Sequence, residues 1–141
     1  MRHRNLSPEE KQGLRALLAA RLGEKKEILF AYVYGSFVQG PFRDIDIAVF
    51  LADGSTGSSD PLRYELALEQ ELEEVTGVPI DVRVLTTAPL SFAFTVLRTG
   101  EILVSRDEEA RCEFVCRILT EYHDFSHHRE RYRREALGLL R

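Results

Sequence analysis

The chain has 141 residues and a net charge of −4, a size that fits one ordinary domain with its own core. Its longest apolar runs fall far short of the roughly 20 residues that span a bilayer, and its polar start lacks the apolar stretch of a signal peptide, so we expect a cytoplasmic protein that does not enter a membrane. The last fifteen residues hold five Arg against two Glu, which leaves the rest of the chain acidic and argues against duplex nucleic acid as a direct ligand.

The first half of the sequence predicts a helix, a strand, a short helical turn and a second strand. Ser7-Pro8-Glu9-Glu10 has the pattern of a capping box with proline at the first helical position, and leucines at helical spacing then predict a helix over residues 8–22. The apolar and aromatic run 28–34 predicts a strand. Residues 37–43 have room for one helical turn before a strand that we expect over 44–51.

The second half predicts further helices and strands and a long final helix. After a loop over 52–60, Asp60 and Pro61 can begin a helix that carries Leu62 and Leu66 as well as later leucines and ends at Gly77. The remaining elements are expected, in chain order, as a strand over 80–85, a helix over 90–98, a strand over 102–104 and a helix over about 107–135.

The chain reads as one unit with a basic end. It contains no repeat, low-complexity tract or long linker, so we expect a single domain over 1–141 with a basic helical tail over about 126–141. This tail can be explained by contact with an acidic partner or RNA, or simply by a solvated helix end. The sequence leaves these alternatives open.

A Gly-Ser pair and two aspartates stand where the first two predicted strands end and begin. Gly35 and Ser36 close the first strand, and Asp44 and Asp46 open the second. Residues i and i+2 of a strand point to the same face, so the two carboxylates can hold divalent cations between them. Mg²⁺ prefers one or two carboxylates completed by phosphate oxygens and water, and Gly35 and Ser36 can offer backbone and hydroxyl groups to those phosphates. The pattern indicates metal-dependent nucleotidyl transfer.

A third carboxylate is expected from the strand over 80–85, where Asp81 stands inside an apolar run. Paired strands lie about 4.8 Å apart, so pairing with 44–51 would bring Asp81 within reach of Asp44 and Asp46. Asp81 could then bind a second metal or accept the proton of an attacking hydroxyl group, and three such carboxylates would raise one another's pKa without metal. Taken alone, Asp81 could instead cap a turn or pair with Arg83.

The runs Tyr34-Gly-Ser-Phe-Val-Gln-Gly and Arg43-Asp-Ile-Asp-Ile-Ala-Val-Phe resemble the minimal nucleotidyltransferases (MNT) of the polymerase-β superfamily. The resemblance extends to Ile80-Asp-Val-Arg and to the stretch that starts at Gly100. It implies an α/β (α+β) fold with a small mixed sheet of about four strands, a polymerase-β-like nucleotidyltransferase core and a long C-terminal helix.

The same resemblance implies an enzyme with a protein partner. It implies two Mg²⁺ ions held by Asp44, Asp46 and Asp81 as catalytic residues, and ATP bound at Gly35 and Ser36. The family includes antitoxins of HEPN-domain ribonuclease toxins, which are understood to adenylylate a tyrosine of the toxin. It therefore implies a hetero-oligomer with a HEPN toxin, which the protein silences by transferring AMP to it.

The resemblance leaves the acceptor open. Seven residues separate Ser36 from Asp44, where the common family pattern has about ten, so we expect a shorter wall at the nucleotide pocket. One alternative is a small-molecule acceptor, as in aminoglycoside nucleotidyltransferases, although these usually carry an additional helical domain. Another is a non-catalytic antitoxin that neutralises its partner by binding alone.

Two weaker patterns lie in the predicted last helix. Cys112, Cys116 and His123 could bind zinc, but no fourth ligand stands at helical spacing. Arg117 and His123 match the loose Arg-x₄₋₆-His pattern of HEPN ribonucleases, a spacing that arises often by chance on a charged helix. Packing and surface roles explain these residues better.

Overall fold

Helices and strands alternate along the chain in the computed structural model, which describes residues 3–56 and 60–139. Within the last helix only the backbone is described at 125–126, 132–133 and 135–139. Residues 57–59 of the predicted loop and 140–141 of the predicted tail lie outside the described residues. The elements are α1 (Pro8–Gly23), β1 (Ile28–Tyr34), α2 (Ser36–Gln39), β2 (Ile45–Leu51), α3 (Pro61–Thr76), β3 (Ile80–Val84), α4 (Leu90–Thr99), β4 (Glu101–Ser105) and α5 (Glu108–Leu139).

The strands of the described residues form one sheet in the order β3-β2-β1-β4. The central strand β1 pairs antiparallel with both β2 and β4, whereas β2 and β3 run parallel. The parallel pair is connected through α3, as a crossover between parallel strands requires. The expected mixed sheet of about four strands, flanked by helices, is confirmed.

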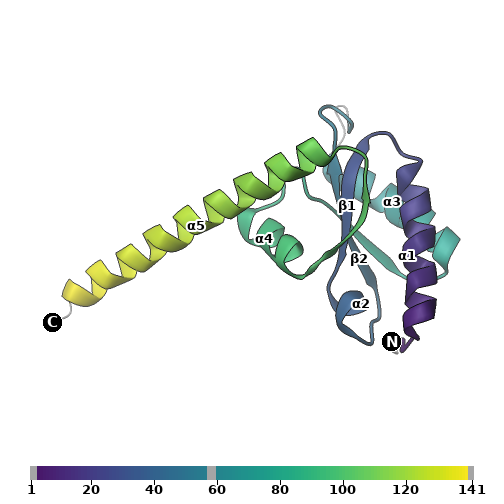
Figure 1. Ribbon diagram of the computed structural model, residues 1–141, viewed down its shortest axis with the longest axis horizontal. Coiled ribbons are helices and arrows are strands. Elements are labelled where there is room, and N and C mark those ends of the chain that lie inside the picture. Colours follow the sequence, from purple (N-terminus) through teal and green to yellow (C-terminus); the bar gives the residue numbers. More distant parts are fainter. Residues whose placement is uncertain (1–2, 57–59, 140–141) are drawn as a thin grey trace.

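Helices cover both faces of this sheet, and each face has its own apolar cluster (Figure 1). On the face of α1 and α3, Leu18 and Leu72 pack against Ile47 and Val49 of β2. On the face of α4 and α5, the second cluster is largely aromatic, and its rings include a stacked pair, Phe30 and Phe50, with centroids 4.6 Å apart. Because successive side chains of a strand alternate between faces, the even-numbered residues of β2, and those of β1 from Phe30 onward, face α4 and α5.

The helix ends lie close to the positions that the sequence predicts. Ser7 and Glu10 form the capping box of α1, with the Glu10 N–H donating to Ser7 Oγ at 3.1 Å and the Ser7 N–H to Glu10 Oε1 at 3.1 Å. Asp60 caps α3 by accepting the Leu62 N–H, and Gly77 ends that helix in the left-handed conformation with φ 71°. Local chemistry therefore fixes these boundaries.

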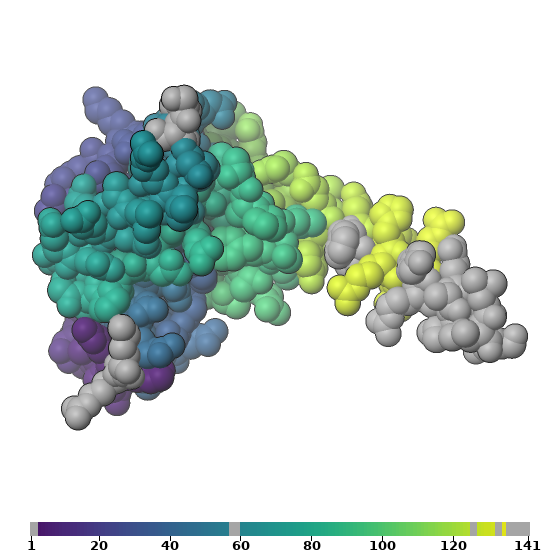
Figure 2. Space-filling view, turned by 180° about the vertical axis from the view of Figure 1, so that it is seen from behind, coloured from purple at the N-terminus to yellow at the C-terminus, as the bar shows by residue number. Residues whose placement is uncertain are grey.

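The first turns of the last helix pack on the body. Phe114 and Ile118 are buried, and Tyr122 stacks on Phe94 of α4 with ring centroids 3.6 Å apart. Beyond this contact α5 projects from the body, as Figure 1 and Figure 2 show. The expected long C-terminal helix is confirmed, with its described end at Leu139. No helix within 3–56 or 60–139 is long and apolar enough to cross a membrane.

One boundary differs from the expectation at a position that concerns function. The second strand was expected to include Asp44, but β2 begins at Ile45. Its ladder with β3 starts there, because Ile45 pairs with Ile80 and its N–H donates to the Pro79 carbonyl at 3.0 Å. Asp44 therefore lies in a bend directly before the strand.

Candidate active site

Three polar side chains stand side by side across neighbouring strands on the face of α4 and α5. In the register of the sheet, Asp46 of β2 is the partner of Asp81 on β3 and of Tyr34 on β1. Register partners point to the same face of a sheet, at a strand spacing of about 4.8 Å. The expected approach of Asp81 to Asp46 is therefore present in the backbone register, and Tyr34 extends the row on the other side.

Burial and the neighbouring carboxylates favour the protonated form of Asp46. Burial, and then the charges of Asp81 and Asp44, raise the pKa of Asp46 to about 6. Burial, and then the charges of Asp46 and Asp81, also raise the pKa of the Tyr34 hydroxyl. Asp44, although outside the strand, is thus part of the same electrostatic cluster. A cation placed among these groups would relieve both the burial of charge and the repulsion.

The donor chemistry of the cluster fits a hard divalent cation. The side chains offer only oxygen donors, and Mg²⁺ commonly takes one or two protein carboxylates while phosphate oxygens and water complete its octahedron. Within the described part of the chain, no three His, Cys, Asp or Glu side chains form a group that could hold a metal by themselves. The register supplies the carboxylate pair Asp46 and Asp81, with Asp44 beside it, so a nucleotide's phosphate oxygens would have to complete the coordination.

Replacing Asp46 with Asn is expected to stabilise the metal-free protein at pH 8. The substitution removes a half-buried negative charge that two neighbouring carboxylates repel, for a gain on the order of 1 kcal/mol after screening by solvent. Thermal unfolding without divalent cations measures the effect. Asp53→Asn, at an exposed loop position, is the control and should leave the melting temperature unchanged. A lower melting temperature for Asp46→Asn would contradict this view of the cluster.

Gly35 lies in direct contact with this cluster. It has φ +80°, and a Cβ atom added there would lie 2.4 Å from Asp46 Oδ2. The position therefore requires glycine both for its backbone conformation and for the space that the carboxylate occupies. Ser36 follows at the start of α2 with an exposed side chain. Gly35 and Asp46 thus lie against one another, although they stand eleven residues apart in the sequence.

Contacts from α1 hold the short connection between Ser36 and Asp44 in place. The Lys11 ammonium group donates hydrogen bonds to the carbonyl oxygens of Phe37 and Gly40, both at 2.7 Å. It also lies over the rings of Phe37 and Phe42, 5.3 and 5.5 Å from their centroids. Two backbone hydrogen bonds between Arg4 and Phe42 fix the other end of the connection. These contacts position the turn that carries Gly35 and Ser36.

Lys11→Met is expected to destabilise the fold by about 1–3 kcal/mol, since two hydrogen bonds from a charged donor are lost while the apolar stem is kept. Chemical denaturation measures this loss. Lys26→Met, at an exposed position on the α1–β1 connection, is the matched control and should change the unfolding free energy by less than about 0.5 kcal/mol. Equal stability of the two variants would show that Lys11 does not hold the turn.

The strand that carries Asp81 lies at an edge of the sheet, and glutamates of α3 cover that edge. The N–H groups of Ile80, Val82 and Val84 donate to the carboxylates of Glu73, Glu69 and Glu65 at 3.0, 3.4 and 2.7 Å. Glutamates spaced four residues apart on a helix lie on one side, so they match alternate N–H groups of the strand. This row holds β3, and with it Asp81, against the helix.

Asp81 also faces Arg83, the pairing that the sequence left open as an alternative. Arg83 Nε lies 3.6 Å from Asp81 Oδ1, and the two side chains are 59% and 40% exposed. An ion pair this exposed contributes little to stability. It therefore leaves the Asp81 carboxylate available for another partner, and the pairing with Arg83 does not exclude a catalytic role.

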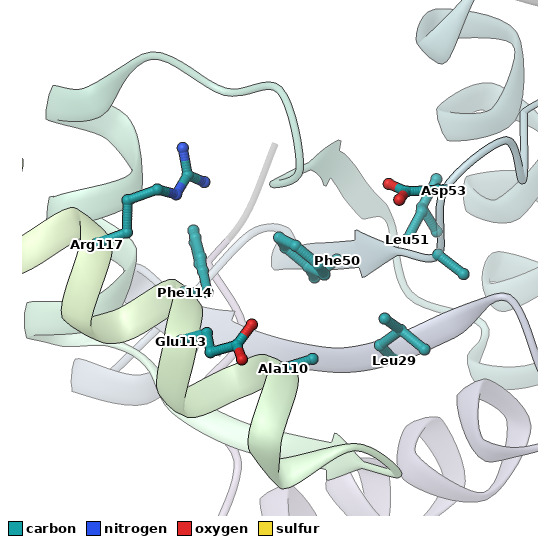
Figure 3. A pocket seen from close by; sticks show the side chains of 9 residues that line it. Leu29, Phe50, Leu51, Asp53, Ala110, Glu113, Phe114 and Arg117 are labelled. Atoms are coloured by element: carbon teal, nitrogen blue, oxygen red, sulfur yellow. The ribbon is translucent and has the colours of Figure 1, made fainter.

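A pocket of about 370 Å³ lies away from this cluster, between α5 and the far ends of β1 and β2 (Figure 3). Its lining includes Leu29, Phe50 and Phe114, with Glu113 and Arg117 of α5. Phe50 is four residues beyond Asp46 along the strand, which corresponds to about 13 Å. This pocket is therefore separate from the carboxylates.

The cysteines of α5, Cys112 and Cys116, lie on the exposed helix surface as free thiols.

Sequence reasoning missed several residues of the site. The sequence motif includes Tyr34 but indicates no role for it, although its position on β1 shares the face of Asp46. The Lys11 side chain and the α3 glutamates form hydrogen bonds with backbone groups that are distant in the sequence. No local sequence pattern predicts these contacts. Phe92 of α4 also contacts the row, with its ring edge-to-face on Tyr34 at 5.6 Å between centroids. The strand alternation could have identified Tyr34, but not the other residues.

Comparison with known families gives one match. The family model described as "Polymerase beta, Nucleotidyltransferase" matches residues 18–109, a segment that contains Gly35, Ser36 and all three aspartates. No protein with a curated description matches the sequence.

Several solved structures share the fold. A chain of the MntA–HepT toxin–antitoxin crystal structure superposes with a TM-score of 0.65 and 20% identity, over 89% of this chain and 99% of that one. A chain from a tri-AMPylated Shewanella oneidensis HEPN toxin in complex with its MNT antitoxin gives 0.66 and 21%, over 89% and 98%. A chain of a toxin–antitoxin structure with AMP-PNP gives 0.64 and 22%, over 93% and 99%. At these identities the likeness establishes the fold.

Proposed function

Since the chain belongs to the polymerase beta nucleotidyltransferase family, we propose that it transfers AMP from ATP to a tyrosine of a HEPN-domain toxin and so acts as that toxin's antitoxin. The observation that carries the proposal is the register pairing of Asp46 with Asp81, with Gly35 packed against Asp46. This arrangement places oxygen donors for a cation beside a turn for phosphates. Nucleotidyl transfer needs these two elements together.

Each predicted residue has a distinct role in this proposal. Asp44 and Asp46 hold Mg²⁺, and Gly35 and Ser36 bind the triphosphate. Two Mg²⁺ ions, when bound, would offset the negative charge of the phosphates and of the departing diphosphate. Asp81 accepts the proton of the attacking hydroxyl group, a role that suits its exposed carboxylate and its place at the edge of the row.

The partner is proposed from the solved neighbours and from the shape of the molecule. MNT antitoxins in complex with HEPN toxins are among the proteins that share this fold, and one such toxin is AMPylated. The projecting end of α5 supports a hetero-oligomer, because an isolated helix gains little stability without a packing partner (Figure 1). We therefore propose a HEPN-domain protein encoded by a neighbouring gene as the acceptor.

Two differently labelled ATP samples test the reaction. The protein is incubated with Mg²⁺, the neighbouring HEPN protein and ATP labelled at either the α- or the γ-phosphate. The expected result is label on the partner from α-labelled ATP and none from γ-labelled ATP. Label from γ-labelled ATP would indicate phosphoryl transfer, and label from neither sample would refute the proposed reaction. Label that appears only on an added small molecule would instead support the aminoglycoside-like alternative.

A further inference from the structure

A second pocket, of about 280 Å³, lies where the start of α3, the end of β3 and the start of α4 meet. Pro61, Pro89 and Phe92 give it apolar walls, and Glu65 and Arg83 add charged groups. Ligand pockets for whole small molecules commonly have about 300–1,000 Å³. The pocket has room for a single aromatic side chain.

This pocket adjoins the carboxylate row through two side chains. Arg83 Nε lies 3.6 Å from Asp81 Oδ1. The Phe92 ring contacts Tyr34, which is the register partner of Asp46. The pocket therefore borders the row, with Arg83 beside Asp81 and Phe92 against Tyr34.

The order of groups across the sheet sets a direction for the reaction. Gly35 follows β1, Asp46 lies on β2 and Asp81 lies on β3, and the pocket lies further along β3 beside Arg83 and Val84. In an in-line displacement the attacking oxygen and the leaving diphosphate occupy opposite sides of the α-phosphorus. If the diphosphate leaves from the Gly35 turn, the acceptor must approach from the side of Asp81.

We propose that this pocket is the acceptor subsite and receives a phenol side chain of the partner protein, an inference that rests on the proposed function. The ring packs against Phe92 in the edge-to-face or offset geometry that aromatic pairs prefer. Arg83, beside the phenolic oxygen, favours the negative charge that develops there. Glu65 is already bonded to the Val84 N–H, so it shapes the wall of the pocket.

The transfer step forms one P–O bond, breaks another and moves one proton. The phenolic oxygen attacks the α-phosphorus of ATP and forms the new P–O bond. The bond between the α-phosphorus and the oxygen that bridges to the β-phosphorus breaks, and diphosphate leaves with that electron pair. The phenolic proton passes to the Asp81 carboxylate.

A pair of leucine substitutions on α4 tests the acceptor subsite by steady-state kinetics. Phe92→Leu keeps an apolar side chain but removes the ring that faces the pocket. It is expected to raise KM for the HEPN acceptor protein about tenfold, with KM for ATP changed less than about twofold. Thr95→Leu is the control on the same helix, because Thr95 is exposed and does not line the pocket, and it should leave both constants unchanged. A rise in the KM for ATP alone would assign the pocket to the nucleoside, and no change in either constant would also overturn the proposal.

A binding experiment separates this proposal from the proposed function. N-acetyl-L-tyrosinamide is titrated into ¹⁵N-labelled protein that holds AMP-PNP and Mg²⁺, with N-acetyl-L-serinamide as the comparison. The expected result is saturable shifts of the Arg83, Ala88 and Phe92 amide signals with the tyrosine compound only. Absence of these shifts, or equal shifts with the serine compound, would overturn the subsite. These amide shifts report binding and do not require AMP transfer. A wild-type protein that transfers no AMP would therefore refute the proposed function, while the shifts would still decide whether the pocket binds the phenol.

Discussion

Asp46→Asn is expected to lower AMP transfer by roughly 10³-fold or more, because the substitution removes a charged oxygen ligand from the centre of the carboxylate row. The same change should not unfold the protein, since it relieves repulsion in the metal-free state. Transfer of α-labelled AMP to the HEPN partner, measured at saturating Mg²⁺, provides the rate. Asp44→Asn should give a loss in the same direction, as a second carboxylate of the cluster.

Binding of the partner provides the control for this experiment. Asp46→Asn should still co-purify with the HEPN protein, because the contact proposed for α5 lies away from the carboxylates. The partner's ribonuclease activity should then remain uninhibited. If the variant transferred no AMP and still inhibited the ribonuclease fully, neutralisation by contact alone would replace the enzymatic account. If transfer persisted at the wild-type rate, the assigned site would be wrong.

Gly35→Ala is expected to abolish transfer and to cost about 1–3 kcal/mol of stability. The left-handed φ of +80° disfavours alanine, and the added Cβ would lie 2.4 Å from Asp46 Oδ2, so the carboxylate must move. Gly77→Ala is a matched control, because Gly77 has φ +71° and no atom within 4 Å of its Cβ position. Both variants carry backbone strain, but only Gly35→Ala displaces Asp46.

Unfolding and transfer assays on the two variants separate strain from displacement. Gly77→Ala should lose on the order of 1 kcal/mol and keep its transfer rate. Gly35→Ala should lose at least as much stability and nearly all transfer. Comparable transfer rates in the two variants would mean that the contact between Gly35 and Asp46 has no part in the reaction.

Local sequence signals were sufficient for the order of helices and strands. Ser7 and Asp60 form the caps that their residue types suggest, and Gly77 ends α3 in a conformation that glycine adopts readily. The expected pairing of the strand over 80–85 with the strand over 44–51 was also enough to predict that Asp81 approaches Asp46. Their direct pairing depends on the parallel register, which begins at Ile45 and Ile80. The same register leaves Asp44 outside the strand, contrary to the expectation.

Contacts between distant segments explain what the sequence did not predict. Leu62 and Leu66, two leucines of the predicted helix, are 55% and 56% exposed on α3. The helix instead buries Leu68 and Leu72 and turns its row of glutamates toward the edge of β3. A pattern of leucines alone cannot reveal that acidic side chains of the same helix have backbone N–H groups to bind. Lys11 likewise donates hydrogen bonds to carbonyl oxygens that are distant in the sequence, in the connection that follows Gly35.

AMP transfer at the row of Asp46 and Asp81 would add the mass of AMP to the protein partner. Intact mass spectrometry of the neighbouring HEPN protein, co-expressed with this chain, detects this addition. The expected result is a partner mass increased by whole AMP units, with the addition on tyrosine and absent when Asp46→Asn is co-expressed. An unmodified partner, or a modification that persists with Asp46→Asn, would contradict the claim.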